Sequence, residues 1–285
     1  MAEGLSRNRI VFGDNLPVLR EMEARSARLI YIDPPFNTGT RQTRERLHVV
    51  PDEEGGDRTG YQGRRYRSIR LGSMSFEDSF DDFLAFLSPR LMEARRVLTG
   101  DGSLFVHLDC REVHYVKVLL DGIFGRRSFM NEIVWAYDFG ARSRRRWPAK
   151  HDNILWYANN PRRYVYNYDQ IERVPYLAPG LVTQEKARRG KTLTDTWWHT
   201  VVATNGRERT GYPTQKPVAL LERIVKVHSQ PGDLVLDFFA GSGTTGEAAV
   251  RHGRRFLLVD NNSEAVGVMA RRLAFARPEI VGWEG

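Results

Sequence analysis

Cysteine and long apolar segments are what this sequence most clearly lacks. Its single cysteine, Cys110, excludes an internal disulfide framework and is typical of a protein from a reducing cytoplasm. No apolar run approaches the ~20 residues that a membrane-spanning helix needs. Residues 1–4 also do not resemble the apolar core of a signal peptide. We therefore expect a cytoplasmic protein that has no membrane partner.

Positive charge is the most evident feature of the composition. The chain of 285 residues is 41% hydrophobic and 27% charged, which suits a globular protein with one large α/β domain or two smaller domains. Its formal net charge is +8 at pH 7. A basic balance favours a polyanionic partner such as nucleic acid, although many basic proteins bind none.

A short apolar run, residues 29–32, ends at the segment Asp33-Pro34-Pro35-Phe36. The run is typical of a buried strand in a parallel sheet. Because proline has a fixed φ and no N–H, the chain should leave this strand stiffly, with carbonyls that can accept hydrogen bonds. Asp33 and the Pro34 carbonyl could then bind one NH₂ group, while Phe36 offers its face to a flat ring. The alternative is a strand that ends in an ordinary tight turn.

Residues 37–75 are rich in glycine and arginine and have no clear periodicity. A loop of this length is usually either functional or disordered. Its position directly after Phe36 favours a mobile flap over the site. The alternative is a solvated insertion that has no role.

Two β-rich runs, residues 133–137 and 153–158, predict a hairpin at the edge of a sheet. The loop between them carries the cations Arg142, Arg144, Arg145, Arg146 and Lys150. Over residues 159–212 the regular pattern is lost, and Lys and Arg are interleaved with Tyr and Trp. Cations contact phosphates and aromatic rings stack on bases, so this mixture favours nucleic acid. Packing of the aromatic side chains into a minor core is the alternative, and for Trp197 and Trp198 it is the interpretation that we favour.

A glycine-rich turn follows the predicted strand 233–237. Gly241, Gly243 and Gly246 have the G-x-G-x-x-G spacing, and Asp260 ends the next predicted strand about 20 residues beyond the first glycine. The glycines let the backbone approach a ligand, and an acid at this place can accept from a ribose hydroxyl. The pattern predicts a nucleoside-binding βαβ unit, which suits NAD as well as S-adenosylmethionine.

Lys216 stands just before a predicted helix that has Pro217 at its first position. A cation at the positive end of the helix dipole costs roughly 0.3–1 kcal/mol when it has no counter-charge. A ligand carboxylate at this place would reverse the sign of that cost. A solvated lysine is the alternative.

Three segments together carry a family resemblance. D-P-P-F at 33–36, T-Q-K-P at 214–217 and D-F-F-A-G-S-G-T-T at 237–245 resemble the β group of DNA amino-methyltransferases. This group includes small modification enzymes and the methylating subunits of type III restriction systems. The likeness covers nearly the whole chain. One departure is Phe238, where many relatives carry proline, and it leaves the glycine turn intact.

The resemblance implies a Rossmann-like α/β fold, with a seven-stranded, mostly parallel sheet and helices on both faces. The order of its halves would be circularly permuted. Residues 1–137 would be the catalytic half, with the flap at 37–75, and residues 213–285 would be the cofactor-binding half of the same domain. Residues 138–212 would form the hairpin and a small target-recognition region between the halves.

The resemblance also implies S-adenosylmethionine as the cofactor. Asp260 would bind its ribose, Asp14 its adenine, and Lys216 or Thr214 its amino-acid end, while the glycine turn would wrap the methionine part. The full set of expected cofactor-binding residues is Asp14, Thr214, Lys216, Asp237, Phe239, Ala240, Gly241, Ser242, Gly243, Asp260 and Asn261.

The implied reaction is methyl transfer to the exocyclic amine of a base flipped out of double-stranded DNA, without a metal or a covalent intermediate. The catalytic residues would be Asp33, Pro34, Pro35 and Phe36, and the DNA contacts would come from Arg142, Arg144, Arg145, Arg146 and Lys150. A cognate restriction endonuclease and a second copy of the chain are the further partners that this family allows.

Three alternatives stay open at this point. Relatives with serine in place of Asp33 tend to act on cytosine N4, so Asp33 favours adenine N6 without excluding cytosine. An NAD-dependent oxidoreductase would explain the glycines but would leave the D-P-P-F segment without a role. A non-catalytic DNA-binding module would explain the charge but would need no cofactor pocket.

Overall fold

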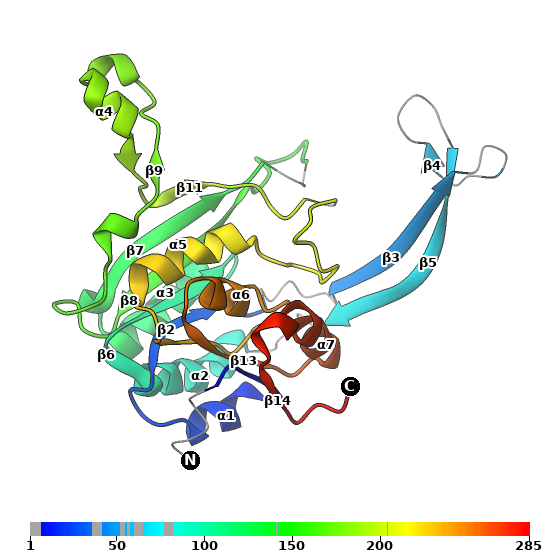
Figure 1. The fold of residues 1–285 in the computed structure, drawn as a ribbon, viewed down its shortest axis with the longest axis horizontal. Coiled ribbons are helices and arrows are strands. Elements are labelled where there is room, and N and C mark those ends of the chain that lie inside the picture. Colours follow the sequence, from blue (N-terminus) through cyan, green and yellow to red (C-terminus); the bar gives the residue numbers. More distant parts are fainter. Residues whose placement is uncertain are drawn as a thin grey trace.

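The computed structural model describes residues 7–35, 42–51, 55, 58–59, 65–76, 82–138, 140, 142–203 and 205–285. Figure 1 shows a central twisted sheet flanked by helices, from which two slender elements project. Among the helices in these described ranges, none is both long and apolar enough to cross a bilayer.

The central sheet has nine strands among the described residues. Their order across the sheet is β11 (Thr196–Trp198), β7 (Phe129–Ala136), β8 (His151–Ala158), β6 (Leu98–Leu108), β2 (Ala27–Ile32), β12 (Leu234–Asp237), β13 (Arg255–Asp260), β1 (Arg9–Phe12) and β14 (Glu279–Val281). All neighbours are parallel except for β8, which runs antiparallel to both β6 and β7. The mostly parallel sheet is confirmed, but the expected number of seven strands is wrong. The outermost strands β11 and β14 have only three residues each, too few to show a periodic pattern.

Helices cover both faces of this sheet. The helices α1 (Asn15–Glu21), α2 (Phe83–Val97) and α3 (Val113–Phe124) pack in one apolar cluster, and α5 (Val218–His228), α6 (Thr244–Arg251) and α7 (Ser263–Arg272) pack in a second. Successive residues of β12 alternate between the two clusters, with Leu234 and Leu236 in the first and Val235 in the second. Each fully buried side chain of this kind contributes ~1.5–3 kcal/mol. The two-sided core explains why these strands are continuously apolar.

Four parallel strands bring the acidic residues to one edge of the sheet. Strand β2 pairs with β12, β12 with β13, and β13 with β1, so their carboxyl ends lie side by side. Asp33 and Asp14 follow the ends of β2 and β1, while Asp237 and Asp260 end β12 and β13. The strand that leads to Asp33 therefore lies beside the strand that ends at Asp237. Ligands of open α/β sheets bind at such a carboxyl edge.

The segment after the D-P-P-F turn contains strands that were not expected. Strands β3 (Gln42–Pro51), β4 (Arg58–Thr59) and β5 (Arg65–Phe76) form a separate antiparallel sheet in the order β3-β5-β4. Figure 1 shows β3 and β5 projecting away from the sheet. The expectation of an irregular loop is wrong for these strands, because the pairing of a ribbon uses backbone groups and needs no apolar alternation. Its role as a flap stays a prediction.

The chain forms the predicted hairpin after α3. Strands β7 and β8 pair antiparallel and are joined by the basic loop, residues 137–150, which confirms the hairpin. The expectation that this hairpin forms the edge of the sheet is wrong, because β11 pairs with the outer side of β7. Farther along, β9 (Arg173–Val174), α4 (Gln184–Arg189) and β10 (Lys191–Thr192) form an arm that projects from the body (Figure 1). Short 3₁₀ helices cover Arg126–Ser128, Tyr168–Gln170, Pro179–Leu181 and Ala274–Ala276.

The two tryptophans of β11 have different environments. Trp197 packs in the second apolar cluster, so its burial is confirmed, although this cluster belongs to the central sheet and is not a separate minor core. Trp198 is 75% exposed, so the expectation that it packs in a core is wrong. The two side chains point to opposite faces because they are neighbours on one strand.

Candidate active site

Asp33 and Lys216 form the centre of the carboxyl edge. The Asp33 Oδ2 atom accepts a hydrogen bond from the ammonium of Lys216, and the two groups form an ion pair in which both side chains are mostly buried. The other oxygen, Oδ1, is buried and has no hydrogen-bond partner among the described residues. A buried acceptor without a donor costs about 1–3 kcal/mol, so this atom is poised to accept from a ligand.

Only part of the D-P-P-F segment can be placed. Pro34 is buried and Pro35 is half-buried directly after Asp33. Phe36 lies outside the described residues, so its stacking on a base stays a prediction.

The glycine turn between β12 and α6 has the predicted backbone geometry. Gly241 and Gly243 have φ of +49° and +74°, in the left-handed region that side chains disfavour. A Cβ at Gly246 would lie 2.7 Å from Leu258 Cδ1, so the third glycine lets α6 pack closely on β13. The Gly241 N–H donates to Asp260 Oδ2 at 2.8 Å. The turn and the acid of the next strand are thus joined directly.

The carboxylates of Asp237 and Asp260 both accept hydrogen bonds from backbone N–H groups at this edge of the sheet. Asp237 accepts from the Phe239 N–H at 3.0 Å and from the Thr245 hydroxyl at 2.6 Å. Burial raises the pKa of Asp237 to about 7, a rise that these hydrogen bonds oppose and that the charges of Asp33 and Asp260 increase. Burial likewise raises the pKa of Asp260 to about 6, against the backbone hydrogen bonds that it accepts. A cation bound here would offset this crowding of negative charge.

Asp14 occupies the end of the edge beyond β13. Its Oδ1 caps α1 by accepting from Leu16 N at 2.9 Å, and it also accepts from Arg90 Nη2 at 2.9 Å. Arg90 is buried and donates through Nε to Asn15 Oδ1, and the Asn15 amide donates to the Phe238 carbonyl at 2.6 Å. These contacts fix Asp14 relative to the glycine turn. The sequence reasoning missed Arg90 and Asn15, because a buried arginine on α2 has no local signal.

The other expected cofactor residues surround the turn. Ala240 and Ser242 are buried and Phe239 is half-buried, whereas Thr214 and Asn261 are exposed. Thr214 has a φ of +58°, an unfavourable value for a β-branched residue that marks a constrained turn before Lys216. Contact of these side chains with a cofactor stays a prediction.

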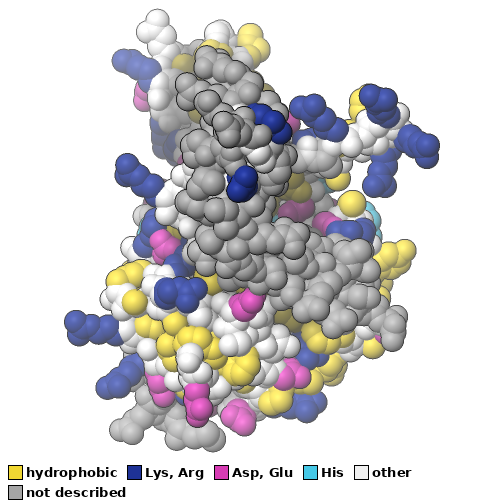
Figure 2. Space-filling model, turned by 90° about the vertical axis from the view of Figure 1, so that its right-hand side faces the viewer, with side chains coloured by type: hydrophobic (Ala, Val, Ile, Leu, Met, Phe, Trp, Pro, Cys, Tyr) yellow, Lys and Arg dark blue, Asp and Glu magenta, His cyan; other side chains and the backbone are white. Residues whose placement is uncertain are grey.

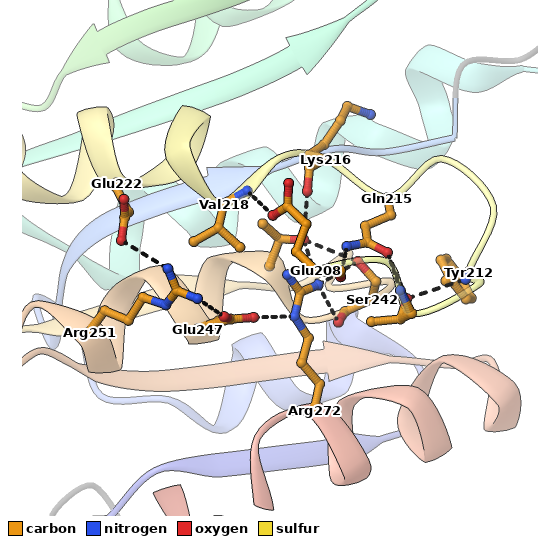
Figure 3. A network of polar contacts seen from close by, with 12 residues as sticks. Glu208, Tyr212, Gln215, Lys216, Val218, Glu222, Ser242, Glu247, Arg251 and Arg272 are labelled. Atoms are coloured by element: carbon orange, nitrogen blue, oxygen red, sulfur yellow. Dashed lines mark hydrogen bonds and ion pairs between the residues drawn. The ribbon is translucent and has the colours of Figure 1, made fainter. Parts of the chain in front are cut away.

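A polar network supports the glycine turn from behind (Figure 3). Arg251 contacts Glu222 at 3.6 Å and also pairs with Glu247, which in turn pairs with Arg272. Arg272 then donates to the Ser242 carbonyl at 3.1 Å. A guanidinium can serve several acceptors at once, so Arg272 fixes the turn from α7. Sequence reasoning did not identify it.

The same network reaches Lys216 through Thr244. Arg272 Nη1 donates to Thr244 Oγ1 at 2.9 Å, and that hydroxyl donates to the Lys216 carbonyl at 3.1 Å. The adjacent helix α5 begins with Val218, whose N–H donates to Glu208 Oε2 at 3.0 Å. The backbone of Lys216 is therefore held next to the glycine turn, while its ammonium reaches Asp33 at the end of β2.

A second polar network lies inside the sheet next to Asp33. The Tyr31 hydroxyl lies 2.7 Å from His107 Nδ1, and His107 Nε2 lies 3.1 Å from Asp152 Oδ2. The Tyr137 hydroxyl donates to Asp152 Oδ1 at 3.0 Å. Burial would raise the pKa of Asp152, but the hydrogen bond and charge of His107, the charge of Lys216 and the Tyr137 hydrogen bond lower it. The network ties β2 and β6 to the β7–β8 hairpin.

The expected DNA-binding cations lie at the end of that hairpin. Arg142, Arg144, Arg145 and Arg146 are exposed, and Lys150 is half-buried and donates to the Gly140 carbonyl at 3.1 Å. The Ser143 hydroxyl accepts from the amides of Arg145 and Arg146 at 3.2 Å each, so the loop has a defined turn. Figure 2 shows Lys and Arg side chains projecting from the upper part of the molecule on several sides. Contact with DNA stays a prediction.

Taken together, these residues fit a cationic nucleoside cofactor. The glycine turn offers close backbone approach, Asp260 and Asp14 stand at successive strand ends, and the buried carboxylates favour positive charge. Lys216 supplies the one cation of the described edge that touches Asp33. S-adenosylmethionine, with a sulfonium and an amino-acid end, has this chemistry.

Comparison with known proteins agrees with this geometry. A family profile described as DNA methylase matches residues 27–271. The DNA adenine methyltransferase YhdJ of Escherichia coli (strain K12) is 30% identical over 275 residues, covering 94% of this chain and 83% of YhdJ.

Solved structures show the same fold at lower identity. TTHA0409 from Thermus thermophilus, a putative DNA modification methylase complexed with S-adenosyl-L-methionine, has a TM-score of 0.60 and 22% identity over 98% of this chain and 100% of that one. The cytosine-N4-specific PvuII DNA methyltransferase has a TM-score of 0.64 and 15% identity over 97% and 95% of the two chains. The chain belongs to the N6/N4 DNA methylases, the S-adenosylmethionine-dependent enzymes that methylate exocyclic amines of DNA bases.

Proposed function

We propose that this DNA methylase acts on the N6 amine of adenine. The observation that carries the proposal is Asp33 itself, an aspartate with a buried, unpartnered oxygen at the end of β2, beside the strand that leads into the glycine turn. An aspartate at this position favours adenine within the family, and the similar YhdJ is described as an adenine methyltransferase.

The chain's own residues would divide the work as follows. Asp33 Oδ1 and the Pro34 carbonyl would accept the two N–H groups of the amine, which draws the nitrogen lone pair out of conjugation with the ring. Phe36 would stack on the base. S-adenosylmethionine supplies an electrophilic methyl group when it is bound. Catalysis then rests on positioning and on electrostatic stabilisation of the amine, without a metal ion or a covalent intermediate.

The cofactor would lie across the edge formed by β12, β13 and β1. Asp260 would accept from the ribose, Asp14 would face the adenine, and Lys216 would meet the amino-acid end. The remaining contacts would come from Thr214, Asp237, Asn261 and the turn Phe239 to Gly243. The order β2-β12-β13-β1, which joins strands from both ends of the chain, supports a circularly permuted domain with halves 1–137 and 213–285.

Double-stranded DNA would enter above this edge. The amine of a paired base cannot be reached inside the stack, so the target base must be flipped out. The cations of the β7–β8 loop would hold the phosphates, and residues 138–212 would read the target. Such an enzyme works in the cytoplasm, alone, as a homodimer or beside a restriction endonuclease.

Methylation mapping tests the assignment of the base. The protein would be produced in cells that lack other DNA methylases, and their DNA would be digested to nucleosides for mass spectrometry and sequenced for modified positions. We expect N6-methyladenine at one short motif, and none with Asp33→Ala. N4-methylcytosine at a motif would overturn the adenine assignment, and no modified base from folded protein would overturn the proposed function.

A further inference from the structure

The ion pair between Asp33 and Lys216 joins the two halves of the site. The residues are 183 positions apart, and both side chains are mostly buried. A buried charge is stable only beside a counter-charge, so each group depends on the other here. In this arrangement the ammonium contacts Oδ2 of the carboxylate whose other oxygen, Oδ1, would receive the base amine.

The backbone of Lys216 cannot follow its side chain. Its carbonyl accepts from Thr244 in the glycine turn, and the N-terminus of α5 immediately after it is held by Glu208. Figure 3 shows the Lys216 side chain extending away from this network. The ammonium can therefore change partner only by rotation of the side chain about a fixed point.

A second carboxylate is expected within reach of that fixed point. Thr244 directly follows Gly243, so the residue that holds Lys216 belongs to the turn that would wrap the methionine part of the cofactor. Lys216 would there meet the α-carboxylate of a bound cofactor. The helix dipole of α5 also favours an anion in front of its N-terminus. One ammonium would thus have two alternative partners, the carboxylate of Asp33 and the carboxylate of the cofactor.

We propose that Lys216 is a positioning residue that couples cofactor binding to the base site. Without cofactor, its ammonium holds Asp33. When cofactor is bound, the ammonium moves to the cofactor carboxylate, and the Asp33 carboxylate, whose Oδ1 receives the base amine, no longer has a cation on its Oδ2. Because a carboxylate paired with a cation is a weaker acceptor, Asp33 then binds the base amine most strongly after the methyl donor has bound. This inference rests on the proposed function for the role of Asp33 toward the base.

Two ligands that differ only in the amino-acid end test the coupling. S-adenosylhomocysteine carries the α-carboxylate, whereas 5′-methylthioadenosine has the same nucleoside and thioether without it. Their dissociation constants would be measured by calorimetry for the wild type, Asp33→Asn, Lys216→Met and the double variant. Lys226→Met, at the other end of α5, is the matched control for loss of one positive charge.

If the carboxylates of Asp33 and the ligand compete for Lys216, each variant should change the ligand affinities in a specific way. Asp33→Asn should tighten S-adenosylhomocysteine by roughly 5–10-fold, because Lys216 no longer has to leave a partner. Lys216→Met should weaken it by roughly 10–100-fold, the scale for a lost charged hydrogen bond. Neither substitution should change the affinity for 5′-methylthioadenosine. When Lys216→Met is also present, Asp33→Asn should no longer change the affinity for S-adenosylhomocysteine.

Other outcomes would overturn the proposal. If Asp33→Asn leaves the affinity for S-adenosylhomocysteine unchanged or lowers it, Lys216 does not exchange partners. If Lys216→Met weakens both ligands equally, its role is only structural. Lys216→Gln repeats the measurement if the methionine variant does not fold. The calorimetry contains no DNA, so its outcome does not depend on whether methylation mapping finds adenine or cytosine as the target. Likewise, failure of the coupling in calorimetry would leave the assignment of the target base unchanged.

Discussion

The pH dependence of stability gives a quantitative test of the acidic edge. Asp237 is buried, and its pKa is raised to about 7 from 3.8. Between these values the folded protein keeps a proton that the unfolded chain has lost, so this group makes the free energy of unfolding fall as pH rises. The slope is ~1.4 kcal/mol per pH unit, which gives about 2–3 kcal/mol between pH 5 and pH 7.

Asp237→Asn removes this titration while keeping the shape of the side chain. The amide oxygen can still accept from the Phe239 N–H, and the amide nitrogen can donate to the Thr245 hydroxyl, which now acts as the acceptor. Relative to the wild type, the variant should therefore gain about 2–3 kcal/mol as pH rises from 5 to 7. Contributions from groups common to both proteins, such as Asp260, largely cancel in this difference.

Urea unfolding of cofactor-free protein at pH 5, 6 and 7 measures that difference. The slope of unfolding free energy against urea concentration must be the same for both proteins for the comparison to hold. A difference that stays constant over this range would refute the reasoning, because it would mean that Asp237 is already ionised in the folded protein at pH 5.

Three further predictions concern single steps of the proposed reaction. Asp33→Ala should lower turnover by at least ~10²-fold without weakening S-adenosylmethionine binding, since the lost acceptor faces the base; turnover above about a hundredth of wild type in a methyl-transfer assay would contradict it. Asp260→Ala should weaken S-adenosylmethionine by roughly 1.5–3 kcal/mol, the scale for a charged acceptor, and unaltered binding in calorimetry would show that the ribose assignment is wrong. Arg144→Ala with Arg145→Ala should lower the slope of log DNA affinity against log salt by roughly two, about 0.9 for each phosphate contact. Affinity would be titrated against salt for both proteins on cognate and scrambled duplexes, and equal slopes would mean that the loop is only a solvated turn.

Local rules were enough to predict the elements that build the edge. The apolar run before Asp33 and the runs before Asp237 and Asp260 became β2, β12 and β13, because strands buried on both faces need continuous apolar side chains. The glycine turn was also predictable, because positive φ and close helix packing at these positions both favour a residue without a Cβ. A hairpin with a basic loop was also visible in the order of the residues.

Short or unpatterned elements were beyond the reach of sequence. The strands β11 and β14 have three residues each and form only because a longer neighbour offers its edge. The strands of the β3–β5 ribbon lack the alternation of apolar and polar residues from which a strand can be predicted. In each case the pairing of backbone groups, which every residue carries, decided the structure.

Contacts between distant residues were decided by tertiary structure alone. Lys216 was expected to face solvent or a ligand carboxylate, yet its partner is Asp33, which the parallel pairing of β2 and β12 brings to the same edge. Arg272 supports the glycine turn only because α7 packs against that half of the sheet. The residue types of the site were thus determined by the sequence. Their partners depended on which strands became neighbours, because an ion pair is specified by distance in space and leaves no periodic trace along the chain.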